Sequence, residues 1–184
     1  MRRILLLTTA VMALAGCDLS SEPAGADKAG PASDTAASAP SAGGSFAHSQ
    51  TEDLSGYYRV GEPRVGPADF ALMSLFLGQA QEFRDWEEGR RTATFAPVML
   101  EFQGPGETPE RVLPESYAVS DGQVRMTGKT SAGERVTFVG RMDAGALATA
   151  RRNLGGGEAP AVTAVVVVGD QTWSGVKLSW YGGD

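Results

Sequence analysis

Between residues 117 and 181, most of the chain consists of short runs with apolar residues at every second position, separated by turns that contain glycine. Alternate side chains of a strand point to opposite faces, so this period predicts strands that bury one face. The turn Ser120-Asp-Gly122 between two such runs predicts an antiparallel hairpin. We therefore expect a mainly β fold of the α+β kind. One antiparallel curved sheet or small barrel of about six to eight strands would carry one or two helices.

The same reasoning places the individual elements. Strands are expected at 54–60, 92–102, 117–119, 124–127, 135–139, 161–168 and 173–181, and a loop at 104–114. The run 161–168 is almost entirely β-branched or apolar, which is typical of a strand buried on both faces. A first helix is expected over 67–88, because Pro67 suits a first helical turn and apolar residues follow at three- and four-residue spacings. A second, short helix is expected after Asp143, which can cap it, and through Arg152.

The N-terminus has the parts of an export signal. Arg2 and Arg3 precede an apolar run at residues 4–14, and small residues follow. The run is shorter than the ~20 residues that a membrane-spanning helix needs. The next residues, Leu14-Ala-Gly-Cys17, resemble the lipobox of bacterial lipoproteins. This resemblance implies that the signal peptide, residues 1–16, is removed and that Cys17 carries diacylglycerol and a further acyl chain such as palmitate.

The lipobox resemblance covers the first seventeen or eighteen residues and implies a place in the bacterial cell envelope. Two or three acyl chains anchor a protein stably, because each buried methylene contributes about 0.8 kcal/mol. Asp18 resembles the residue that retains lipoproteins of enteric bacteria at the inner membrane. We therefore expect the periplasmic face of the inner membrane, with the outer membrane or the cell surface as alternatives.

Residues 17–51 are rich in alanine, serine, glycine and proline, and Leu19 and Phe46 are their only large apolar side chains. Such a segment buries too little surface to offset its ordering entropy, so we expect a disordered tether with a reach of roughly 30 Å. His48, the single histidine, falls near the end of this tether and is expected to face solvent. The globular domain is expected to cover 52–184.

Charge and composition exclude several classes of function. The chain has 16 Lys and Arg against 22 Asp and Glu, a net charge of −6, which argues against a nucleic-acid partner. One cysteine and one histidine cannot form a disulfide or the usual zinc site, so we expect neither a metal nor a cofactor. Ser174 and Lys177 match the S-x-x-K pattern of penicillin-binding enzymes. In a strand, however, this spacing points the two side chains to opposite faces, which disfavours an acyl-enzyme.

Aromatic residues are the candidate ligand-binding groups. Such rings can stack on a sugar, a peptide or an apolar ligand, or can simply pack in the core. The candidates are Tyr58, Trp86, Trp173 and Trp180. The segment Ser55-Gly-Tyr-Tyr58 is also faintly similar to the Gly-x-Trp start of the lipocalin-like calycins, with tyrosine in place of tryptophan.

Two functions of different class are therefore expected. The preferred one is a membrane-anchored lipoprotein whose tethered domain is a non-catalytic binding module for an envelope protein or a small apolar ligand. No catalytic residues can be assigned in that case. The alternative is an envelope hydrolase that acts on peptidoglycan or another polymer through a convergent carboxylate pair. Its candidate carboxylates are Asp85, Glu87, Glu88, Glu101 and Glu115.

Overall fold

A computed structural model describes residues 45–153 and 159–182. Within these ranges the chain forms ten strands and two helices. The strands are β1 (Phe46–His48), β2 (Gly56–Val60), β3 (Ala71–Leu77), β4 (Val98–Gln103), β5 (Glu110–Val112), β6 (Pro114–Ser120), β7 (Gln123–Lys129), β8 (Arg135–Met142), β9 (Val162–Val168) and β10 (Gln171–Tyr181). The helices are α1 (Ala80–Glu87) and α2 (Ala144–Arg152). The expected mainly β fold with two helices is confirmed, with ten strands instead of about six to eight.

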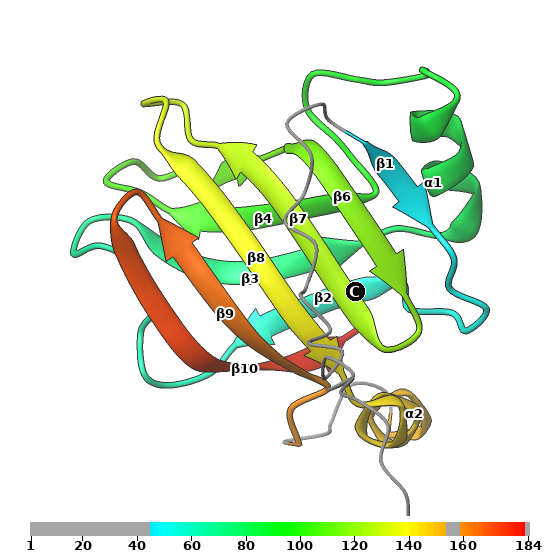
Figure 1. The fold of residues 1–184 in the computed structure, drawn as a ribbon. Coiled ribbons are helices and arrows are strands. Elements are labelled where there is room, and N and C mark those ends of the chain that lie inside the picture. The colour runs from blue at the N-terminus through cyan, green and yellow to red at the C-terminus, as the bar shows by residue number, and fades with distance from the viewer. Residues whose placement is uncertain (1–44, 154–158, 183–184) are drawn as a thin grey trace, which may run out of the picture. The chain divides into compact units, whose positions relative to one another are not determined.

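All ten strands belong to one sheet, in the order β1-β6-β7-β8-β9-β10-β2-β3-β4-β5. Every neighbouring pair is antiparallel except β1 and β6, which are parallel. The sheet curls into a half-barrel, so that β6 to β9 lie across from β2, β3 and β4 (Figure 1). The curl gives the sheet an inner face that excludes water and an outer face that solvent reaches.

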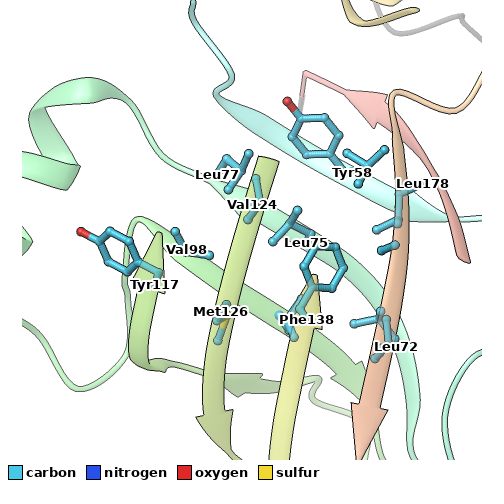
Figure 2. Packing of buried hydrophobic residues seen from close by; sticks show 14 of the residues in the cluster. Tyr58, Leu72, Leu75, Leu77, Val98, Tyr117, Val124, Met126, Phe138 and Leu178 are labelled. Carbon is cyan, nitrogen blue, oxygen red and sulfur yellow. The ribbon is translucent and has the colours of Figure 1, made fainter. Parts of the chain in front are cut away.

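The inner face carries the hydrophobic core. Tyr58, Leu75, Phe138 and Leu178 are fully buried, and Figure 2 shows their side chains directed into the same space between the strands. Side chains of this size from facing strands leave the interior packed to the density usual for proteins. The space inside the curl is therefore occupied by the protein's own side chains.

The segment expected to form a helix over 67–88 is instead a strand followed by a shorter helix. β3 pairs with β2 on one side and with β4 on the other, so its backbone groups are satisfied in the sheet. A run that is apolar on several successive positions fits a buried strand as well as a helix, and tertiary pairing decided between them. Helix α1 begins after Gln79, where Glu82 accepts a hydrogen bond from the Gln79 N–H at 2.6 Å.

Three further expectations were wrong in detail. The run 161–168 was expected to be buried on both faces, but β9 alternates and the Val165 side chain is 39% exposed, because only one face of the sheet packs on the core. The region 104–114 was expected to be a loop, but it contains β5, which pairs with β4. β1 falls within the range expected to form the tether, because Phe46 packs against aromatic side chains of the domain.

The predicted hairpin and the predicted second helix are confirmed. β6 and β7 form an antiparallel hairpin in which Ser120 pairs with Gln123 next to the turn. The Asp143 carboxylate accepts a hydrogen bond from the Ala146 N–H at 2.9 Å and so caps α2. Arg151 lies in the last turn of α2, where a cation interacts favourably with the helix dipole.

Candidate functional site

An open groove of about 470 Å³ lies where β2, β3 and β10 meet the start of α1 and the end of α2. Its size is within the usual range for ligand-binding sites. The groove is lined by both aromatic and charged side chains. These include Asp53, Tyr57, Phe76, Glu82, Arg151 and Trp180.

Arg151 is held in the wall of this groove by several contacts. Its Nη1 forms an ion pair with the Asp53 carboxylate at 2.7 Å, and its Nη2 donates to the Ser55 carbonyl oxygen at 2.8 Å. The guanidinium carbon lies 5.1 Å from the centre of the Trp180 ring, which favours a cation–π interaction. The Arg151 Nε is buried and has no acceptor among the described residues.

The ion pair also changes the acidity of Asp53. Its hydrogen bond with Arg151 lowers the pKa of the Asp53 carboxyl to about 2, against the opposing effect of partial burial. The Asp53 carboxylate is therefore charged at neutral pH. Its negative charge balances the positive charge of Arg151, and the ion pair holds the Arg151 guanidinium in place in the groove wall.

The aromatic side of the groove is built by strand register. Tyr57 and Phe76 lie opposite each other on β2 and β3, with ring centres 5.0 Å apart. Phe76 also contacts Phe95, with ring centres 5.3 Å apart. These rings form a continuous aromatic edge.

Gly56 allows the Trp180 indole to lie against the backbone of β2. Gly56 has a φ of +129°, and a Cβ at this position would overlap the Trp180 Nε1. That Nε1 donates a hydrogen bond to the Ser55 carbonyl oxygen at 2.9 Å. A glycine is therefore required here for both conformational and steric reasons.

The four aromatic residues predicted to bind a ligand do not lie together. Trp180 lines the groove, whereas Trp173 lines a separate hollow of about 400 Å³ beside the β2–β3 connection. Tyr58 is fully buried, its hydroxyl donates to the Leu54 carbonyl oxygen at 2.6 Å, and burial raises its pKa. Trp86 is buried and packs edge-on against Phe46.

The five candidate carboxylates are each engaged by other side chains. Arg90 binds both Asp85 and Glu88 at the end of α1. Two more carboxylates lie in cross-strand ion pairs. These are Glu101 with Arg111 at 3.1 Å and Glu115 with Lys129 at 2.6 Å.

The fifth carboxylate, Glu87, belongs to a partly buried cluster that was not expected from the sequence. His48 Nδ1 lies 2.9 Å from both Glu87 oxygens, and the Tyr117 hydroxyl donates to Glu87 at 3.0 Å. The His48 ring stacks on Phe83, with ring centres 5.1 Å apart. Burial, and then the Glu87 carboxylate, raise the pKa of Tyr117.

The expectation that His48 faces solvent was therefore wrong. Its side chain is only 17% exposed, because β1 pairs with β6 and packs beside α1. The alternation of Phe46 and His48 was the only local signal for this strand, and three residues are too few to distinguish it from a tether. The cluster connects β1, α1 and β6 and contributes to holding them together.

No helix in the described ranges is long and apolar enough to cross a membrane. The same part of the chain has no group of three or more side chains that could hold a metal ion.

The chain matches no protein-family model, no curated protein and no solved structure.

Proposed function

We propose that this protein is a lipoprotein of the bacterial cell envelope whose β-rich domain is a non-catalytic module that binds another envelope protein in the Arg151–Trp180 groove. Cys17, the proposed lipid attachment site, and Asp18, the proposed sorting residue, lie outside the described residues. The proposed location is the periplasmic face of the inner membrane.

The composition of the groove is the observation that carries the proposed binding function. Tyrosine, tryptophan and arginine are the residue types most enriched at protein interfaces, because they combine large contact areas with hydrogen-bonding groups. Tyr57, Trp180 and Arg151 all line the groove, with Arg151 over the Trp180 ring and Phe76 opposite Tyr57. It is open along its length, which suits a segment of another protein better than an enclosed small molecule.

The lining of the groove also indicates the chemistry of the proposed partner. Tyr57 and Phe76 supply an aromatic edge, and the Arg151 charge is already paired with Asp53. The binding hypothesis therefore favours a partner segment that places an apolar side chain against the aromatic edge.

The anchor is tested in cells by labelling with a palmitate analogue and by fractionation. The expected result is labelling of the wild-type chain, recovery with the inner membrane, and loss of both in Cys17→Ala. Tight membrane association of Cys17→Ala would contradict the lipoprotein proposal. Recovery of the wild-type protein with the outer membrane would contradict only the proposed location.

Partner binding is tested with a photo-crosslinking amino acid at Gln79, an exposed residue that lines the groove. The matched control is the same substitution at Gln171, which is exposed at the start of β10 and does not line the groove. Irradiation of whole cells should give a discrete adduct from Gln79 only. Absence of an adduct from Gln79, or the same adducts from both sites, would contradict binding in the groove.

A further inference from the structure

The strands β7, β8, β9 and β10 contain no aspartate or glutamate at any position, although the whole chain has a net charge of −6. They are consecutive neighbours in the sheet and lie side by side in Figure 1. Several cations of these strands are exposed on the outer face. We define the basic face as Arg125, Arg135, Arg141 and Lys177 with Val139 and Val165.

Strand register determines how the basic face is arranged. Arg125, Val139 and Val165 are successive cross-strand partners on β7, β8 and β9. Two residues further along β9, Thr163 lies opposite Arg141 of β8 on one side and opposite Lys177 of β10 on the other. Two exposed valines are thus bordered by cations on neighbouring strands.

The cations of the basic face are available for an external anion. In the described part of the chain, none of these four cations forms an ion pair. By contrast, Arg90, Arg111 and Arg151 elsewhere in the domain are all paired with carboxylates. The acidic residues nearest to these strands in the sequence lie in the flanking turns, at Asp121, Glu134, Asp143 and Asp170, so the middle of the face carries cations only.

We propose that the basic face binds the anionic phospholipid headgroups of the membrane in which the protein is anchored. This inference rests on the proposed function, because acylation of Cys17 holds the domain near that surface. Residues 18–44 separate the anchor from the first described residues, and 27 residues span at most about 95 Å. The anchor would therefore confine the domain near the membrane, where the effective concentration of headgroups is high enough to populate even a weak contact.

The chemistry of the face matches such a surface. Lysine and arginine are attracted to anionic headgroups within about a Debye length, and small apolar side chains can enter the headgroup layer. The serine and threonine side chains between the cations, among them Thr137, Thr163 and Ser174, can donate to phosphate oxygens. Ser174 shares this face with Lys177, contrary to the expected opposite faces, because a bulge between Ser174 and Val176 shifts the register of β10.

The test uses the full mature chain, residues 17–184, with Cys17→Ser so that no acyl chain contributes. Flotation with vesicles of phosphatidylglycerol and phosphatidylcholine should carry the protein at low salt, whereas vesicles of phosphatidylcholine alone should not. High salt should release it. Arg125→Gln with Arg141→Gln should lower the partition coefficient by roughly 30-fold, from about 1 kcal/mol per cation at an anionic surface.

The matched control is Arg84→Gln with Arg152→Gln, which removes the same charge from two exposed helix positions outside the face. This pair should leave the partition coefficient unchanged. Failure of the unsubstituted chain to float with phosphatidylglycerol, or equal weakening by both pairs, would overturn the proposal. The lipid assignment would also be wrong if the unsubstituted chain did not float with vesicles but bound an acidic protein, and if Arg125→Gln with Arg141→Gln abolished that binding. The basic face would then be a binding site for a protein partner.

The two proposals fail separately. If the protein is acylated at Cys17 in cells but its Cys17→Ser form does not bind anionic vesicles, only the proposed binding of headgroups is wrong. If the protein is not acylated but its Cys17→Ser form floats with anionic vesicles, only the proposed lipid anchor is wrong.

Discussion

The contact between Gly56 and Trp180 allows a sharp test of how the groove is built. Gly56→Ala would place a Cβ where the Trp180 indole lies, on a backbone with a φ of +129° that side chains rarely adopt. The backbone of β2 or the indole of Trp180 must then move. Either movement breaks the hydrogen bond from Trp180 Nε1 to the Ser55 carbonyl oxygen.

The expected loss of stability follows from these two effects. A non-glycine residue in such a conformation costs of order 1–3 kcal/mol. Loss of the hydrogen bond adds about 0.5–1.5 kcal/mol. We expect Gly56→Ala to lower the free energy of unfolding by about 2–4 kcal/mol, which lowers the urea midpoint by roughly 1–2 M.

The assay is equilibrium urea unfolding of residues 17–184 with Cys17→Ser. Gly61→Ala is the matched control, because Gly61 follows the other end of β2, has no positive φ and has nothing within 4 Å of an added Cβ. This control should be neutral or stabilising by up to about 1 kcal/mol, through the reduced entropy of the unfolded chain. If Gly56→Ala were as stable as Gly61→Ala, the geometry that we assign to the groove would be wrong.

Three further changes test other parts of the domain by the same urea assay. Tyr58→Phe leaves the buried Leu54 carbonyl oxygen without its donor and should cost about 1–3 kcal/mol; no loss would show that this hydrogen bond is not formed. Asp143→Ala removes the cap of α2 and should cost about 1 kcal/mol, whereas Asp143→Asn should keep most of the stability. The Asp53 pKa is lowered from 3.8 to about 2, so its ion pair stabilises the fold above pH 4 and this contribution is lost as the pH falls toward 2. Because the Asp53 side chain is 64% exposed, the contribution should stay below about 1 kcal/mol, and Asp53→Asn should lose less stability than wild type between pH 4 and pH 2.

The candidate groove was only partly predictable. The expected helix after Asp143 placed Arg151 near its end, and Trp180 was expected within the last strand. Nothing local indicated that Arg151 would contact Asp53, because the two residues are separated by 98 positions. Tyr57 and Phe76 become neighbours only because β3 is a strand paired with β2, and β3 had been predicted as part of a helix.

The partly buried cluster of His48, Glu87 and Tyr117 was missed for a similar reason. Its members come from β1, α1 and β6, and His48 and Glu87 are 39 positions apart. A three-residue strand has no recognisable period, and its stability depends entirely on the parallel partner. The alanine-, serine-, glycine- and proline-rich composition of residues 17–51 therefore led to the prediction of a tether that included β1.

The amino-acid sequence by itself determined the features that depend on neighbouring residues. Alternation predicted the strands β6, β7, β8 and β10, and a β-branched run predicted β9. A glycine turn predicted the β6–β7 hairpin, and Asp143 predicted the start of α2. These signals are local, because side-chain direction, turn geometry and capping depend on neighbouring residues. Only the tertiary structure decided that β3 is a strand, and that the groove and the basic face exist. Each of these depends on which distant strands pair and in which register, since a shift of one residue would move every side chain of a strand to the other face.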